Sequence, residues 1–495
     1  MGVVIRQSLK GTTLNLIGVA LGAIIQLFVV TEFLLPETLG LTKVFYEASH
    51  LCSCFALLGV SAAGMRFFPF FRNKENNNNG FFFYYMMIPV VGSILISTLY
   101  ILCKGPIDTF FSRESPEFSD YFYLVIPLMI ILAFWSALEN YSNINMRIAF
   151  PKGIREIVQR LLLLVCYLLF ARKILSLDGL MNSMVAAYGL CMLMVLVYVS
   201  RIAPVSLKHD SSFLTPELKR NYFRYTGFLL LSVVSVNIMA QLDMFMLSSV
   251  KGMYEAGVYT IALYIASVSD MPTRSISAIS TPLAADALKN GDFVKANDLY
   301  KQVSIHQFMA SSMILLFLWI NMDNIFSIIP NGELYSQGKY AILFLGLSRV
   351  LYGTVNFGNI MIQFSKYYYW TLTMSVVLTV LTIFTNLLFI PLFGLSGAAL
   401  ATLLTSILSY SFQQYIVQRK IHGNPFTLKT LVMLMILALL LGMNMLIPSM
   451  TSVSPWLDAI VRSSITAAAG GLLVYWFRIS EPVCRFIDKI LKRAA

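Results

Sequence analysis

Charged side chains recur at helical spacing inside long apolar segments of this sequence. Asp270 and Arg274 lie four residues apart in one segment, and Arg349 lies in another with no acidic residue within one helical turn. A charge near the centre of a bilayer costs on the order of 2.5–3.5 kcal/mol on insertion scales, so such residues tend to face a partner or a water-filled cavity. The pattern predicts that Arg349 is a cation facing a cavity. Asp270 and Arg274 either face that cavity or neutralise each other.

Neutral polar residues share helical faces with these charges. Residues three or four apart lie on one side of a helix, as Lys43, Glu47 and His50 do. The face of Arg349 continues in the same way through further polar residues. The candidate cavity residues are Asn15, Gln26, Glu47, His50, Asn237, Gln241, Asp243, Asp270, Arg274, Arg349, Tyr352, Asn356 and Asn359.

A structural explanation stands beside the functional one for each residue. Lys43 and Glu47 can neutralise each other as an ion pair, and Asn and Gln side chains often only join neighbouring helices by hydrogen bonds. The joint pattern favours a functional role for these polar residues, because several helices in both halves of the chain each carry a polar stripe. The sequence therefore predicts a bundle of helices with a polar interior.

The elements that position these residues are transmembrane helices. Of 495 residues, 58% are hydrophobic and only 12% are charged, whereas soluble domains carry about 25% charged residues. Because a bilayer core needs roughly 20 apolar residues per helix, we expect an all-α, polytopic membrane protein with about fourteen spans. The predicted spans are 11–34, 43–66, 81–103, 121–143, 156–173, 180–201, 222–249, 256–282, 303–321, 338–363, 367–390, 395–417, 428–447 and 457–477.

Basic residues indicate the orientation of the spans. Lys and Arg are concentrated in the loops that are cytoplasmic if the N-terminus is cytoplasmic, whereas Asp and Glu divide evenly between the two sides. This is the positive-inside pattern, and it predicts that both termini are cytoplasmic. The same loops account for the net charge of +12, so we expect no nucleic-acid partner.

The sequence offers little support for a cofactor. The six cysteines lie mostly in apolar segments without disulfide or metal spacing, and there are four scattered histidines. No nucleotide-binding loop is recognisable, so direct use of ATP is not expected. We predict a protein that is not an enzyme and has no metal or other cofactor.

The predicted spans divide the chain into four parts. Residues 1–205 form an N-lobe of spans one to six, and residues 206–420 form a C-lobe of spans seven to twelve. Residues 421–477 add spans thirteen and fourteen, which we expect to be almost purely apolar, and residues 478–495 form a basic amphipathic cytoplasmic tail.

Three stretches resemble the oligosaccharide-lipid flippases of the multidrug/oligosaccharidyl-lipid/polysaccharide exporter superfamily. The first, DMFMLSSVKGMYEAGVYTIA, begins at Asp243, and the second, STPLAADALKNGDFVKANDLY, begins at Ser280. The third, NLLFIPLFGLSGAALATLL, begins at Asn386, and its small residues permit a tight turn and close helix approach. The likeness extends over essentially the whole chain.

The resemblance implies two six-helix lobes around a cavity that opens alternately to either side of a bacterial inner membrane. It also implies movement of an undecaprenyl-pyrophosphate-linked oligosaccharide to the periplasmic leaflet, for O-antigen (lipopolysaccharide), capsule or exopolysaccharide. Arg274 and Arg349 would hold the pyrophosphate, and the Asn, Gln, His and Tyr candidates named above would meet the sugars. Asp243, Asp270 and Glu47 are the candidates for ion coupling. Expected partners are membrane lipids and possible polysaccharide polymerases and glycosyltransferases.

Three alternatives stay open. A drug or cation antiporter of the same fold would usually have twelve spans. A peptidoglycan-precursor flippase would have a more basic cavity. A membrane enzyme acting on polysaccharide would need a catalytic group on an outer loop, and the outer loops are short.

Overall fold

The computed structural model describes residues 13–14, 17–73, 77–202, 205, 216–367, 369–448, 454–481, 484–485 and 488. Every regular element within these residues is a helix, which confirms the predicted all-α class. Eight helices in the described part of the chain are long and apolar enough to cross a membrane, and one shorter apolar helix, Ile17–Phe33, adds to them. Within the described residues, the predicted spans fall mainly on helical segments.

The contacts between residues divide the chain into two compact units, Met1–Gly257 and Val258–Ala495. The division differs from the predicted lobe boundary at residue 205, so the assignment of residues 206–257 to a lobe stays a prediction. Most of the predicted tail lies outside the described residues.

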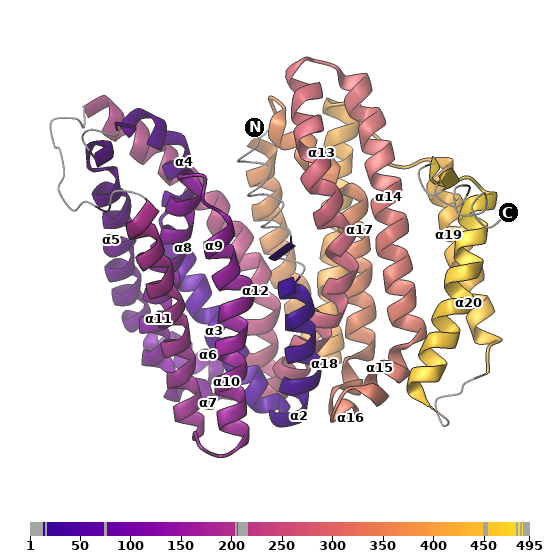
Figure 1. Cartoon of the computed structure of the whole chain (residues 1–495), viewed down its shortest axis with the longest axis horizontal. Coiled ribbons are helices and arrows are strands. Elements are labelled where there is room, and N and C mark those ends of the chain that lie inside the picture. The colour runs from indigo at the N-terminus through magenta and orange to yellow at the C-terminus, as the bar shows by residue number, and fades with distance from the viewer. Residues whose placement is uncertain are drawn as a thin grey trace. The chain divides into compact units, whose positions relative to one another are not determined.

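The elements described in the first unit are helices, coloured indigo to magenta in Figure 1. Its elements are η1 (Ile25–Val30), α2 (Thr31–Phe33), α3 (Pro36–Ala56), α4 (Val60–Phe71), η2 (Asn77–Gly80), α5 (Phe81–Leu102), α6 (Lys104–Phe111), α7 (Glu117–Asp120), η3 (Phe122–Leu124), α8 (Val125–Ile144), α9 (Ala149–Gly153), η4 (Ile154–Val158), α10 (Gln159–Ala171) and α11 (Leu177–Ile202). The central helix α8 packs against α3, α5 and α11.

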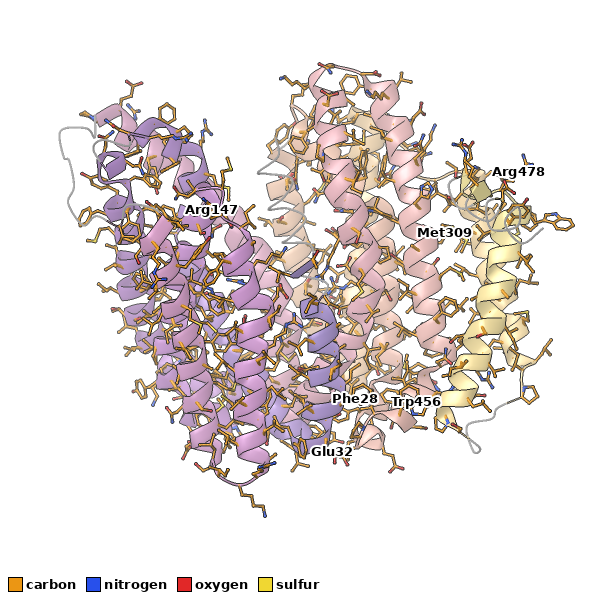
Figure 2. The ribbon with its side chains drawn as sticks, in the orientation of Figure 1. Phe28, Glu32, Arg147, Met309, Trp456 and Arg478 are labelled. Carbon is orange, nitrogen blue, oxygen red and sulfur yellow. The ribbon has the colours of Figure 1, made fainter. Side chains whose placement is uncertain are left out.

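The second unit is organised around α17 (Lys339–Phe364). The helix packs against α13 (Met271–Lys289), α14 (Phe293–Ile320) and α18 (Tyr369–Lys420). The remaining elements are η5 (Val268–Asp270), α15 (Met322–Ile328), α16 (Gly332–Tyr335), η6 (Ser336–Gly338), α19 (Leu428–Met445) and α20 (Pro455–Trp476). In Figure 2, Trp456 and Arg478 mark the two ends of α20, where interfacial aromatic and basic residues are expected.

Two long helices each run from one predicted span into the next. The helix α12 (Pro216–Ser267), which runs from the first unit into the second, breaks at Gly252, where φ is +88°. The helix α18 breaks at Gly394, where φ is +57°. Glycine is the residue that adopts such angles without a steric cost, so each break separates two spans without a longer loop.

The helices of the first unit approach closely at Gly92 of α5. A Cβ atom at this position would overlap the backbone carbonyl oxygen of Ala56 in α3. Around the contact lies a small apolar core that includes Ala56, Met129 and Ala133, all at most 1% exposed. The two backbones can therefore meet only because residue 92 has no side chain.

We expect Gly92→Ala to destabilise the protein by about 1–3 kcal/mol, because the added methyl group forces the backbones of α3 and α5 apart. The matched control is Gly442→Ala on α19, where a Cβ would meet no atom within 4 Å. Thermal unfolding of both variants in detergent measures the effect. Equal unfolding temperatures for the two variants would show that the close contact at Gly92 is not required.

Candidate functional site

The predicted pair Asp270 and Arg274 forms an ion pair. Arg274 Nε donates to Asp270 Oδ2 over 3.0 Å. A 3-10 turn, η5, interrupts the helical path just before Pro272, which occupies the first turn of α13, where proline is tolerated. The Asp270 side chain is 8% exposed and that of Arg274 is 61% exposed. The arginine side chain therefore has more freedom to move away from the ion pair than the aspartate side chain has.

Arg349 of α17 is half-buried, and it forms no hydrogen bond or ion pair with the described residues. The charges of Arg349 and Asp270 both act on the hydroxyl groups of Tyr352 and Tyr410. The two tyrosine rings are 6.1 Å apart between centroids. The second unit therefore brings the free cation, the ion pair and two phenol groups into one region.

The two asparagines on the face of Arg349 differ in their surroundings. Asn356 is 8% exposed, and its Nδ2 donates to Ser277 Oγ of α13 over 3.1 Å. Asn359, one turn further along α17, is half-buried. Asn356 thus joins two helices, which is the structural alternative for this residue, and its role in sugar binding stays a prediction.

The first unit contains a second polar cluster around Glu47 of α3. Glu47 is 7% exposed and forms an ion pair with Lys43, as the spacing predicted. The ring of His50 stacks on Tyr46 at 5.9 Å, and Tyr46 stacks on Tyr188 of α11 at 5.5 Å. Glu47 and His50 therefore lie beside a row of aromatic rings.

Arg155 belongs to the same cluster and was missed in the sequence. It forms an ion pair of 2.7 Å with Glu139 of α8, and its guanidinium lies 5.1 Å from the ring centre of Trp135. The predicted fifth span began at residue 156, which left Arg155 in a cytoplasmic loop; the helix instead begins at Ala149. The shortness of the predicted span was the signal that could have corrected its start.

The structure says less about the surroundings of the remaining predicted cavity residues. Gln26 lies half-buried on η1, and Gln241 and Asp243 lie half-buried on α12. The backbone of residue 237 is helical, but the Asn237 side chain lies outside the described part of the structure, as does all of Asn15.

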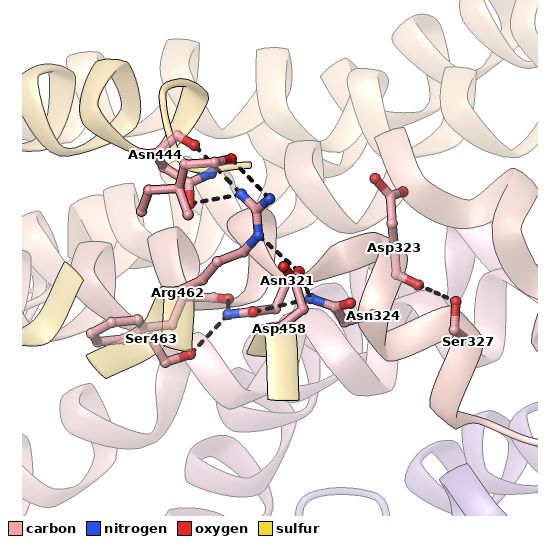
Figure 3. Close-up of polar contacts among 10 residues, drawn as sticks. Asn321, Asp323, Asn324, Ser327, Asn444, Asp458, Arg462 and Ser463 are labelled. Carbon is pink, nitrogen blue, oxygen red and sulfur yellow. Dashed lines mark hydrogen bonds and ion pairs between the residues drawn. The ribbon is translucent and has the colours of Figure 1, made fainter. Parts of the chain in front are cut away.

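The prediction that spans thirteen and fourteen are almost purely apolar is wrong for α20. Arg462 Nε donates to Asp458 Oδ2 over 2.8 Å, and the two side chains are 10% and 3% exposed. Arg462 also donates to the backbone carbonyl oxygen atoms of Asn444 and Ile447 (Figure 3). The pair lies near the start of α20.

This network joins α20 to other helices of the second unit. Asn324 of α15 donates to Asp458 over 2.7 Å, and Asn321 donates to Ser463 over 3.0 Å (Figure 3). A polar pocket of about 260 Å³ adjoins the network and is lined in part by Trp319 and Lys339. All the Arg462 nitrogen atoms have acceptors, so the network holds the helices together.

Comparisons with known proteins agree with this architecture. The MatE family model matches residues 229–388. The solved structure "Lipid II flippase MurJ, inward closed conformation" is similar with a TM-score of 0.67 and 13% identity, over 94% of this chain and 98% of that one. No curated protein sequence matches significantly.

Two transporter structures are also similar. An inward-facing multidrug resistance MATE family transporter of the MOP superfamily has a TM-score of 0.60 and 15% identity, over 81% of this chain and 94% of that one. The MATE multidrug transporter DinF-BH in complex with R6G has a TM-score of 0.56 and 16% identity, over 85% and 95%. Residues 229–388 thus match the MatE family model, and the chain as a whole shares the fold of these flippase and transporter structures.

Proposed function

We propose that this protein is a flippase that moves an oligosaccharide linked to undecaprenyl pyrophosphate across a bacterial inner membrane, for assembly of a surface polysaccharide. The observation that carries the proposal is Arg349, a half-buried cation without a partner among the described residues, beside an ion pair whose arginine is exposed. An unpaired cation at membrane depth is costly, and an anionic substrate group offsets that cost.

The chemistry of the second unit suits a pyrophosphate. Guanidinium groups grip phosphate oxygens through two parallel hydrogen bonds, and Arg349 has its donors available for this. Arg274 can turn from Asp270 to a second phosphate, because its side chain is 61% exposed. The phenol groups of Tyr352 and Tyr410 lie in the field of these charges and can donate to the same anion or to a sugar.

The first unit offers groups that suit a sugar. Tyr46 stacks on Tyr188, and Trp135 packs on Tyr188, near the carboxylates of Glu47 and Glu139. Trp135 and Tyr188 are at most 3% exposed, so the half-buried Tyr46 is the ring of this group that a sugar can reach. Rings with a few convergent polar groups are typical of sites that bind polar organic ligands. Asn15, Gln26, His50, Asn237, Gln241 and Asn359 are further proposed sugar contacts.

Alternating access requires a source of energy, for which we propose an ion gradient. Asp243, Asp270 and Glu47 are the proposed coupling carboxylates, and Asp270 and Glu47 are both at most 7% exposed. Both termini would be cytoplasmic. Glycosyltransferases that build the lipid-linked sugar and a polymerase that consumes it are the proposed partners.

Two other substrates are the alternatives. The likeness to the lipid II flippase structure covers 94% of this chain, whereas those to the two MATE transporter structures cover 81% and 85%. The wider coverage supports a lipid flippase over a drug antiporter. A peptidoglycan precursor is therefore the second candidate, and it shares the pyrophosphate chemistry with the first.

We expect Arg349→Ala to reduce transport of the lipid-linked oligosaccharide at least tenfold, because it removes a charge-assisted contact worth about 1.5–3 kcal/mol. Surface polysaccharide in a flippase-deficient strain measures the effect, with protein level and unfolding temperature near those of the unmodified chain. Arg349→Lys should retain part of the activity, because a lysine keeps the charge but loses the paired hydrogen bonds.

The matched control for this experiment is Arg201→Ala, because Arg201 is exposed at the end of α11. Full export by the Arg349→Ala variant would refute the proposed role of Arg349.

We expect an isoprenyl pyrophosphate such as geranyl pyrophosphate to stabilise the purified protein against unfolding, by about 2.7 kcal/mol at one hundred times its Kd. The cationic dye ethidium should give no stabilisation, and Arg349→Ala should abolish the effect of the pyrophosphate. Stabilisation by ethidium alone would instead favour the drug antiporter.

A further inference from the structure

The polar pocket beside the Arg462 network lies at one end of the second unit and has a volume of about 260 Å³. It is formed where α14 and α19 end and where α15, α17 and α20 begin. Its lining residues differ from those around Arg349, to which the proposed function assigns the pyrophosphate. The pocket therefore needs an explanation of its own.

The charged side chains of the pocket already neutralise one another. Lys339 Nζ lies 2.6 Å from Asp323 Oδ1, and Arg462 Nε lies 2.8 Å from Asp458 Oδ2. The lining thus carries two cations and two anions, arranged as two ion pairs. A phosphate or an ammonium group would have to displace a member of one pair, so the lining favours a neutral ligand.

A buried amide oxygen in the lining lacks a donor. Asn324 is 2% exposed, and its Nδ2 donates to Asp458 Oδ2 over 2.7 Å. Figure 3 shows the amide nitrogen directed at Asp458 and the amide oxygen turned away from it. No described residue donates to this Oδ1 atom. A buried acceptor without a donor costs about 1–3 kcal/mol, and a hydroxyl group that enters the pocket would remove that cost.

Two further groups in the lining can bind hydroxyl groups. Lys339 contacts one oxygen of Asp323, whose side chain is 76% exposed, so the second oxygen can accept a hydrogen bond. Asn444 is half-buried, and its Oδ1 accepts from Arg462 over 3.2 Å, which leaves its amide N–H groups able to donate. The pocket therefore presents both acceptors and donors to a ligand.

An apolar wall completes the pocket. Trp319 of α14 is half-buried, and Lys339 Nζ lies 5.7 Å from the centre of its ring. The ring of Tyr340 lies 6.3 Å away from that of Trp319, and Leu441 of α19 adds an aliphatic side chain to the lining. The cation–π contact restrains the indole ring, so the wall is in place before a ligand arrives.

These features together select the ligand. A sugar residue is a small neutral ring with C–H groups on its faces and hydroxyl groups along its edge. Pockets for drug-sized ligands measure about 300–1,000 Å³, and this pocket, at about 260 Å³, is smaller. We propose that the pocket between Trp319, Asp323, Asn324, Lys339 and Asn444 binds one neutral sugar residue.

The source of the sugar follows from the orientation of the chain, a step that rests on the proposed function. With both termini cytoplasmic, this end of the second unit faces the periplasm. The sugar is then one residue of the transported oligosaccharide after it has crossed the membrane. The pocket therefore holds the product side of the reaction, whereas Arg349 holds the pyrophosphate.

Binding of soluble methyl glycosides to the purified full chain tests the proposal, in a detergent without a sugar head group. The probes are the methyl glycosides of glucose, galactose and N-acetylglucosamine, and saturation-transfer NMR measures their binding. We expect at least one of them to bind saturably. Trp319→Leu and Asp323→Ala should each weaken that binding about tenfold or more, which corresponds to about 1.4 kcal/mol or more.

Two matched controls should bind the glycoside normally. Trp456→Leu removes a tryptophan that is 60% exposed at the start of α20, and Glu333→Ala removes an exposed carboxylate from α16. If Trp319→Leu fails to fold, Asp323→Ala decides, because the Asp323 side chain is largely exposed.

Three outcomes overturn the proposal. They are no saturable binding of any of the glycosides, binding that Asp323→Ala leaves unchanged, and binding of phosphoethanolamine in place of the glycosides. The last outcome assigns the pocket to a phospholipid head group.

A transport measurement separates this proposal from the proposed function. Glycoside binding by the unmodified chain, without export of polysaccharide in the flippase-deficient strain, would overturn the proposed function alone. Export without glycoside binding would overturn the sugar pocket alone.

Discussion

The absence of water from the bilayer core is the constraint on which the arrangement of this protein depends, because a charge within it must find a partner. The described helices solve this mostly within one helical turn. Lys43 with Glu47, Asp270 with Arg274 and Asp458 with Arg462 are all pairs four residues apart. Arg349 departs from this rule, because it has no hydrogen-bond or ion-pair partner among the described residues.

Local pairs of this kind can be predicted from the sequence, and so can the helices that carry them. A span needs about 20 apolar residues, so the hydropathy of the chain indicates where the apolar helices lie. Partners distant in the sequence cannot be found in this way. The contact of Arg155 with Glu139 depends on how η4 packs beside α8, and the contact of Asn324 with Asp458 joins helices far apart in the chain.

Helical spacing also shows which face of a helix a residue occupies, but not what that face meets. Asn356 shares the face of Arg349, yet its amide is bonded to Ser277. The unpartnered hydroxyl groups of Thr273 and Ser311, which lie beside Gly353, could not be predicted from the sequence, since serine and threonine are common in helices and usually bond to their own backbone. Only the packing of η5, α13 and α14 shows that these hydroxyl groups lack partners.

The polar network of α20 has a consequence for how this chain could have changed in evolution. Removal of α19 and α20 would leave the amides of Asn321 and Asn324, now at most 6% exposed, without Ser463 and Asp458 as hydrogen-bond partners. A twelve-helix descendant could therefore not arise by simple truncation. It would first need apolar replacements at both asparagines. The last two helices are therefore retained because buried amides elsewhere in the unit depend on them for hydrogen bonds.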